Sequence, residues 1–145
     1  MSTPRDQLGS YVREWIKSAG NDRESLRLLG EAGPPPSVAF HAQQAVEKLL
    51  KALLISYGVH PAETHVVGDL LGQVHRFDRR LAERLGQLDR LTRYAVTTRY
   101  PDRPTRPPIT LEVRQVAADV AMAQAACAVL DEALAARLTA LSSAQ

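Results

Sequence analysis

The fold is decided by the stretch Phe40-His41-Ala42-Gln43-Gln44-Ala45-Val46-Glu47-Lys48-Leu49-Leu50-Lys51-Ala52-Leu53-Leu54, whose apolar residues recur with the period of an α-helix. The core face of this helix comprises Val46, Leu49, Leu50, Leu53, Leu54 and Tyr57. Ser37 suits the N-cap, because its side chain can accept a hydrogen bond from a backbone amide, and Gly58 is a natural stop. The sequence therefore predicts a core helix from about Ser37 to Tyr57.

Further helices are predicted on both sides of this one. A first helix should run from about Pro4 to Gly30, with Thr3 as its cap. A short helix is expected after Thr64, a fourth after Asp78, and a long last helix over about 110–141. The expected inward residues are, in chain order, Leu8, Tyr11, Val12, Trp15, Ile16, Ala19, Leu26, Leu29; Val67, Leu70, Leu71, Val74; Leu81, Leu85, Leu88, Leu91, Ala95; and Val113, Val116, Val120, Cys127, Leu130, Leu134, Leu138, Leu141.

Two proline clusters, at 34–36 and 101–108, mark loops because proline cannot continue a helix. Helices joined by short connections pack as a bundle. We therefore expect an all-α fold, an antiparallel up-and-down bundle of four to five helices. The length suits a single domain over residues 1–145, with its core at about 6–141.

The composition predicts a cytoplasmic protein that does not enter a membrane. No stretch reaches the roughly 18 unbroken apolar residues that a membrane span needs, and the first residues lack the apolar run of a secretion signal. The single cysteine, Cys127, fits a reducing compartment, and we interpret it as a small core residue among alanines.

A polar face on the core helix is the first candidate site. His41, Gln44, Lys48 and Lys51 share one face by their spacing, and Gln43 and Glu47 form a parallel row beside them. Two interpretations are open: the solvated side of an amphipathic helix, or a binding surface. The mixture of His, Gln and paired Lys and Glu favours the second.

Asp22 lies on the apolar stripe of the first helix, seven residues after Trp15. A carboxylate that faces a core must be paired or hydrogen-bonded. We expect Asp22 to anchor a neighbouring helix through a buried salt bridge; the alternative is that it sets the charge of an active cleft.

A basic segment is the second candidate site. Residues 75–114 contain ten arginines against five acidic residues, although the net charge of the whole chain is only +2. Arginine can bind phosphate in a bidentate manner, but a plain solvated surface would have the same composition. Near its middle, Arg93 precedes Arg99-Tyr100-Pro101-Asp102, where a helix should end. Arginine and tyrosine at a helix end can bind a phosphate and stack a base, or Arg99 and Asp102 can pair to fix the loop.

These segments, taken in order, carry a family resemblance. The string Gln43-Gln44-Ala45-Val46-Glu47-Lys48, followed by Thr64-His65 and by Arg99-Tyr100-Pro101-Asp102, resembles prokaryotic HEPN domains over residues 6–135. The resemblance implies a helical bundle, usually a two-fold dimer with a cleft between the subunits. It also implies a partner, because many members are encoded beside a minimal nucleotidyltransferase as toxin–antitoxin pairs.

Toxic members of that family are metal-independent ribonucleases, in which an arginine precedes a histidine with four to six residues between them. In this sequence no arginine stands at that distance before His41, His60, His65 or His75. Arginine can stabilise phosphate charge but is a poor base, whereas histidine exchanges protons near neutral pH. The family's ribonuclease chemistry therefore does not carry over, unless folding brings His41 or His65 close to Arg99.

The leading hypothesis is a non-catalytic or weakly catalytic HEPN homodimer that binds a nucleotide or RNA, with a nucleotidyltransferase as partner. Its binding surface would combine His41, Gln44, Lys48, Lys51, Arg99 and Tyr100, supported by Asp22, Glu47, Arg93 and Asp102. The alternatives are an RNA-cleaving toxin with a rearranged site and a helical interaction module. The sequence contains no phosphate-binding glycine loop and no paired Cys/His spacing, so we expect no cofactor and no metal.

Overall fold

The structure is a computed structural model that describes residues 1–97 and 111–143. The described regular structure is entirely helical, which confirms the all-α prediction. In chain order the elements are α1 (Pro4–Leu29), α2 (Pro35–Ser56), α3 (Val67–Val74), α4 (Arg79–Arg84), the 3₁₀ helix η1 (Gly86–Thr92), α5 (Arg93–Thr97) and α6 (Val113–Ser143).

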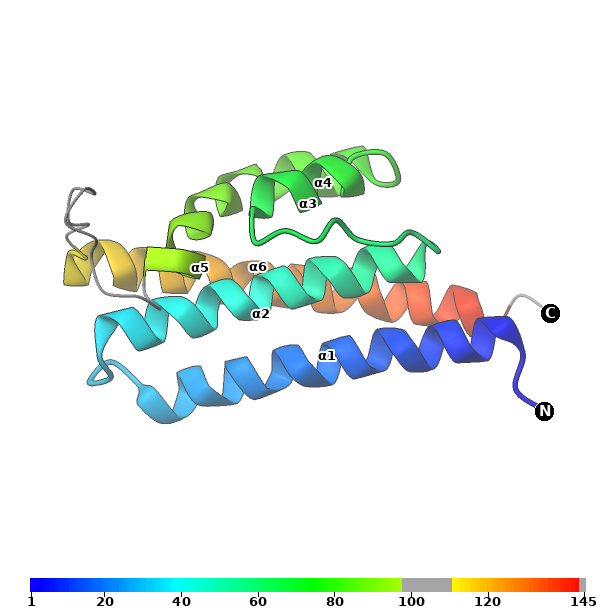
Figure 1. Ribbon diagram of the computed structural model, residues 1–145, viewed down its shortest axis with the longest axis horizontal. Coiled ribbons are helices and arrows are strands. Elements are labelled where there is room, and N and C mark those ends of the chain that lie inside the picture. Colours follow the sequence, from blue (N-terminus) through cyan, green and yellow to red (C-terminus); the bar gives the residue numbers. More distant parts are fainter. Residues whose placement is uncertain (98–110, 144–145) are drawn as a thin grey trace.

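Helix α2 lies at the centre of the bundle (Figure 1). Helix α1 packs antiparallel along one side of it, while α6 packs along another side and runs in the same direction as α2. After α2 an extended segment returns along that helix to the start of α3, and α3, α4 and η1 form a short layer over the same side. The long helices thus form a framework that the short helices cover on one side.

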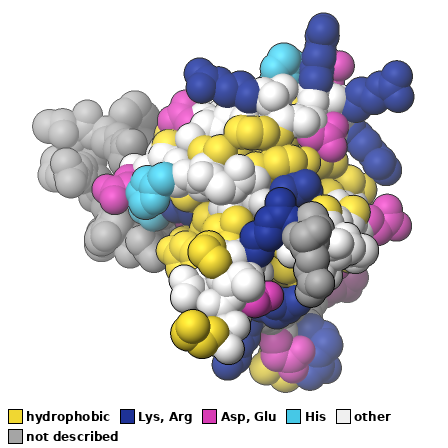
Figure 2. All heavy atoms as spheres, turned by 90° about the vertical axis from the view of Figure 1, so that its right-hand side faces the viewer, with side chains coloured by type: hydrophobic (Ala, Val, Ile, Leu, Met, Phe, Trp, Pro, Cys, Tyr) yellow, Lys and Arg dark blue, Asp and Glu magenta, His cyan; other side chains and the backbone are white. Residues whose placement is uncertain are grey.

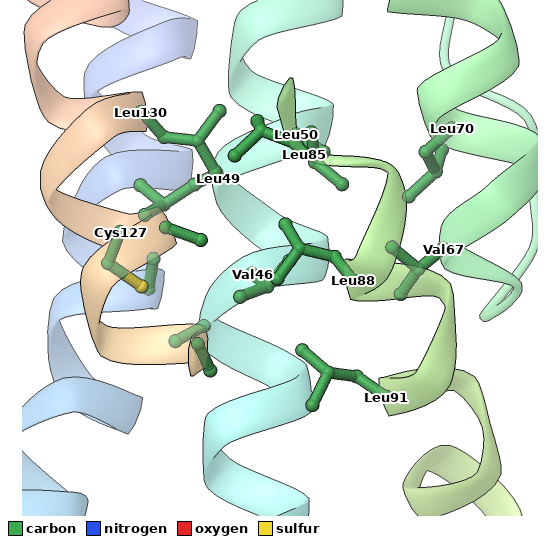
Figure 3. Packing of buried hydrophobic residues seen from close by; sticks show 14 of the residues in the cluster. Val46, Leu49, Leu50, Val67, Leu70, Leu85, Leu88, Leu91, Cys127 and Leu130 are labelled. Carbon is green, nitrogen blue, oxygen red and sulfur yellow. The ribbon is translucent and has the colours of Figure 1, made fainter. Parts of the chain in front are cut away.

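The core is made of leucine and alanine side chains that converge on α2. Figure 3 shows Leu49 and Leu50 of α2 facing Leu130 of α6 on one side and Leu85 of the α4–η1 junction on the other. Burial of such aliphatic side chains stabilises the fold by roughly 1.5–3 kcal/mol each. The structure confirms the inward leucines and valines predicted for the second, third and fourth helical segments.

Helix α1 begins as predicted, with a capping box at its N-terminus. The Asp6 amide donates to the Thr3 hydroxyl over 3.1 Å, and the Asp6 carboxylate accepts from the Thr3 amide over 2.8 Å. These hydrogen bonds hold the pKa of Asp6 below its usual value. One predicted core residue is wrong: Tyr11 is 53% exposed and lies edge-on to Trp15 at the margin of the stripe.

Helix α2 begins two residues before its predicted start. Pro34 is the N-cap and Pro35 and Pro36 form the first turn, so Ser37 lies inside the helix and is not its cap. Proline fits there because the first amides of a helix have no partner within the helix. At the other end the Arg137 guanidinium donates to the Ser56 carbonyl over 2.9 Å and lies over the Tyr57 ring.

The predicted fourth helix is not continuous. A helix follows Asp78 as expected, and Asp78 caps it by accepting from the Leu81 amide, but this α-helix, α4, ends at Arg84 and gives way to η1 and then α5. Gly86 stands at the break, and glycine in a helix interior costs about 1 kcal/mol relative to alanine. The 3₁₀ turn retains the inward direction of Leu88 and Leu91.

Helix α6 is apolar along most of its length and begins three residues later than predicted. Val113, expected in the core, is 68% exposed in its first turn. In the described part of the chain α6 is long and apolar enough to cross a membrane by composition, a test that core helices also pass. Cys127 is buried as predicted, and burial raises the pKa of its thiol to about 11.

Candidate functional site

Asp22 of α1 joins two side chains of α2. Its carboxylate accepts from the Lys48 ammonium over 2.7 Å and lies 2.8 Å from the His41 Nδ1 atom. The carboxylate is nearly buried, whereas His41 and Lys48 are partly exposed. The expected helix anchor is therefore present, and it is also part of a cluster that contains a histidine.

Glu47 is the centre of a second cluster, on the neighbouring part of α2. Its carboxylate lies 2.8 Å from Nδ1 of His65, which comes from the segment between α2 and α3, and 3.5 Å from the Lys51 ammonium. It also accepts from the Gln43 amide over 3.2 Å, and the Gln43 oxygen accepts from the Gln44 amide over 2.6 Å. Glu47 is 3% exposed, so these contacts replace its hydration.

The interpretation of this face as a solvated helix side is wrong. Gln43, Gln44 and Glu47 are all buried, and no buried side-chain nitrogen or oxygen among the described residues lacks a hydrogen-bond partner. The Lys51 ammonium lies 5.7 Å from the centre of the Trp15 ring on α1, so α1 covers part of the face. His65 covers another part from the opposite side.

The two histidines have the same local arrangement. A carboxylate can only accept, so each contact is a hydrogen bond when the Nδ1 atom of His41 or His65 carries the proton. That tautomer leaves the Nε2 lone pair free to accept a proton or a ligand hydrogen bond. His65 is 53% exposed, so its ring is open to solvent. Carboxylates commonly orient histidines in this way at catalytic and metal sites.

The same contacts determine the charge balance of the site. Two carboxylates, Asp22 and Glu47, are paired with two lysines, Lys48 and Lys51. The two lysines therefore balance the charge of the two carboxylates in this site. In the described residues no group of three or more His, Cys, Asp or Glu side chains is placed to hold a metal ion.

Part of the predicted surface cannot be located. Arg99, Tyr100 and Asp102 lie outside the described residues, so the structure does not test whether they meet Lys48. Arg93 begins α5 and lies over the Tyr94 ring, 5.2 Å from its centre. The described site consequently contains His41, Gln44, Lys48 and Lys51 with Asp22 and Glu47, and adds His65 and Trp15.

Sequence reasoning missed a polar cluster around Asp119 of α6. This buried carboxylate accepts from the Tyr94 hydroxyl over 2.6 Å and from the Gln115 amide over 2.9 Å, and it pairs with Arg90 over 2.9 Å. The signal was available, because Asp119 lies among alanines and valines of an apolar helix just as Asp22 lies on the stripe of α1.

Comparison with known proteins identifies the family. The family model described as "HEPN domain" matches residues 12–128. The chain belongs to the HEPN family. The match begins within α1 and ends within α6, so the α2 network lies inside the HEPN domain.

A curated relative of this HEPN chain is the protein of Methanocaldococcus jannaschii named "Putative toxin MJ1304", 29% identical over 99 residues. The matched region covers 63% of this chain and 64% of the relative, so a third of that protein lies outside the match. No solved structure matches the HEPN chain. The chain is therefore a HEPN-family protein with similarity to a protein named as a putative toxin.

Proposed function

We propose that this HEPN protein binds a nucleotide or RNA at the exposed edge of the α2 network. The observation that carries the proposal is the pair of histidines whose Nδ1 atoms are held by buried carboxylates, 2.8 Å away in each case. Their Nε2 atoms remain available to bind a phosphate oxygen when protonated. Lys51, which pairs with Glu47, and Trp15, whose ring lies under the Lys51 ammonium, add a cation and an aromatic face, which are the usual contacts for a backbone phosphate and a base.

The internal ion pairs limit how strong this binding can be. Lys48 and Lys51 already have carboxylate partners, so a phosphate would share those cations with Asp22 and Glu47. Arg99 and Tyr100 stay in the proposal as a further contribution from the segment that follows α5.

The test uses purified full chain titrated with ATP, GTP and short single-stranded RNA at several salt concentrations. Each phosphate contact contributes about 1 to the slope of log affinity against log salt, so Lys51→Gln should lower that slope by about 1. Lys17→Gln is the matched control, because Lys17 is exposed on α1 and outside the network. Binding that responds equally to both variants would locate the ligand elsewhere.

The partner, the oligomeric state and the location of the protein are proposals as well. On the strength of membership in the HEPN family we propose a nucleotidyltransferase encoded beside this chain as partner, a homodimer and a cytoplasmic location. Co-expression with the neighbouring protein, followed by sedimentation of the purified complex and of the chain alone, would test both associations. A chain that sediments as a monomer would contradict the homodimer. A chain that does not bind the protein encoded by the neighbouring gene would contradict the partner.

A second function, RNA cleavage at a rearranged site, is favoured by the same two histidines. One neutral imidazole, His65 or His41, would take the proton of a 2′-hydroxyl as its oxygen attacks phosphorus, and the imidazolium so formed would give that proton to the departing 5′-oxygen. The products would be a 2′,3′-cyclic phosphate and a free 5′-hydroxyl.

Incubation of RNA with the chain separates the two functions. Cleavage that is lost in His65→Ala and kept in His60→Ala would establish catalysis, because His60 is exposed and outside the network. RNA that is bound but stays intact favours binding alone. If neither binding nor cleavage occurs, the polar network serves only packing, as expected of a helical interaction module.

A further inference from the structure

An apolar groove lies between the α4–η1 junction and α6. It has a volume of about 230 Å³ and is lined by Arg84, Leu85, Gln87, Leu88, Met122, Ala125, Ala126 and Val129. No aromatic ring lines it, so it offers no stacking surface for a base. Its leucine, methionine and valine side chains suit an aliphatic or aromatic side chain of a peptide, and methionine adapts readily to different shapes.

Part of the apolar surface of α6 is exposed along this groove. Only 33% of the most apolar stretch of α6 is buried, and Ala125 is exposed on the groove side. The exposed alanines put little steric bulk in the way of a segment that approaches. An incoming side chain would thus gain apolar contact with Met122 and Val129 without displacing core residues, since both are only partly buried.

Arginines stand at the rim of the groove and beyond it. Arg84 lines the groove, and Arg80 lies one turn earlier on α4, so both project from the same side of that helix. The acidic residues of this segment are already engaged: Asp78 caps α4, and Glu83 pairs with Arg79 over 2.9 Å.

Within the part of the chain that the structure describes, these rim arginines have no acidic partner. Neither Arg80 nor Arg84 has an ion pair among the described residues, and Glu132 on the adjacent part of α6 does not reach Arg84. Figure 2 shows several Lys and Arg side chains projecting from the upper part of the molecule, where α3 and α4 lie. Two like charges one turn apart destabilise a helix slightly, and a bound carboxylate would relieve this.

We propose that this groove docks an acidic segment of a partner protein, with one large apolar side chain between η1 and α6 and its carboxylates on Arg84 and Arg80. The charge complementarity selects an acidic segment, and the aliphatic lining selects an apolar anchor beside the acids. This surface is distinct from the α2 network and does not depend on the function proposed for that network. It resembles other grooves that accept an amphipathic segment, in which apolar anchors give affinity and rim charges give orientation.

Selection of a displayed random peptide library against the full chain tests the proposal. The selected peptides should carry Asp or Glu within a few residues of Leu, Met or Phe. A labelled peptide from the selection should lose about tenfold or more in affinity with Arg84→Glu and with Ala125→Trp, which fills the groove, as anchor sites typically do. Arg13→Glu, an exposed arginine of α1, is the matched control and should leave affinity unchanged.

A charge-swap experiment distinguishes a loss of binding from misfolding of a variant. Replacing the acidic residues of the peptide with lysine should abolish binding to the wild type and restore binding to Arg84→Glu, which a misfolded variant could not do. Each variant is also melted, so that a loss of affinity is compared only between folded proteins.

Four results would overturn the proposal. Selected peptides without acidic residues would remove the role of the arginines. Full binding by Ala125→Trp would place the peptide outside the groove. A wild type that sediments as a dimer, with Ala125→Trp as a monomer, would make the groove an interface between two copies. A short RNA that displaces the peptide from the wild type but binds Ala125→Trp equally well would assign the arginines to nucleic acid instead.

Discussion

The Tyr94 hydroxyl donates a 2.6 Å hydrogen bond to the Asp119 carboxylate, and the two residues join α5 to α6 across the buried interior. Arg90 and Gln115 occupy the other carboxylate oxygen, each at 2.9 Å. Burial, and then the Asp119 contact, raise the pKa of Tyr94 from 10.0 to about 12.

Replacing Tyr94 with Phe should lower stability near neutral pH by about 1–2 kcal/mol, because a hydrogen bond to a buried charged group is lost. The pH profile should change as well. The unfolded tyrosine loses its proton near pH 10 and the folded one near pH 12, so the wild type loses stability as the pH rises through that interval. Tyr94→Phe should lack this part of the decline. Urea titrations of both proteins at pH 7, 10 and 11 measure the difference, and parallel profiles would contradict the assignment.

The Cys127 thiol should react only when the protein unfolds. It is 3% exposed, and burial raises its pKa from 9.0 to about 11, so little thiolate forms below pH 9. Labelling with a chromogenic disulfide reagent at pH 8 should be slow in buffer and fast in denaturant. Ala128→Cys in a Cys127→Ala background is the control, since Ala128 is exposed on the same helix and should label at once. Equal labelling rates would show that the α6 interface opens readily.

Removing one member of the Asp22–Lys48 pair should be costly. Asp22→Ala leaves the partly buried Lys48 without its carboxylate, and such breaks typically cost about 3–5 kcal/mol. The double variant Asp22→Leu with Lys48→Met should recover most of that loss, since an apolar pair of similar size replaces both charges. Chemical denaturation of the single and double variants measures the coupling.

Arg23→Ala provides the comparison for that pair. Its ion pair with Asp131 is 39% and 42% exposed, and exposed pairs contribute about 1 kcal/mol or less. A large loss in Arg23→Ala, or a double variant as unstable as Asp22→Ala, would contradict this ranking of the two ion pairs.

Glycine-to-alanine changes should have opposite signs at two positions. Gly72 lies within α3 with nothing within 4 Å of an added Cβ, so Gly72→Ala should stabilise by about 0.5–1 kcal/mol. Gly58 ends α2 with a φ of 78°, where a side chain is strained, so Gly58→Ala should destabilise by about 1 kcal/mol. Thermal melts of the two variants provide the measurement, and shifts of the same sign would refute the explanation.

The helices could be predicted from the sequence where local signals act alone. The capping box at Thr3 and the leucine faces depend on neighbours within a few residues, and the structure confirms them. Of the two proline clusters predicted to be loops, 34–36 forms the start of α2 and 101–108 lies outside the described residues. The break after Arg84 could not be predicted by periodicity, because a 3₁₀ turn and an α-helix both direct Leu85, Leu88 and Leu91 inward.

The environment of the polar residues on α2 could not be predicted from the sequence. The spacing on α2 grouped His41, Gln44, Lys48 and Lys51 correctly, but their burial depends on Trp15, Asp22 and His65, which lie far away in the sequence. A helix pattern describes one element, and α2 is covered from several directions. Polar residues that look solvated in the pattern are therefore buried in the fold.

The contact between Asp22 and α2 also fixes how the two longest N-terminal helices are aligned. A slide of α1 by one turn would displace the carboxylate by about 5.4 Å, beyond reach of both Lys48 and His41. Leucine and alanine faces alone tolerate such slides, because one aliphatic contact replaces another at little cost. A buried carboxylate that has lost its partners does not tolerate such a slide. This one side chain therefore allows only one alignment of α1 on α2.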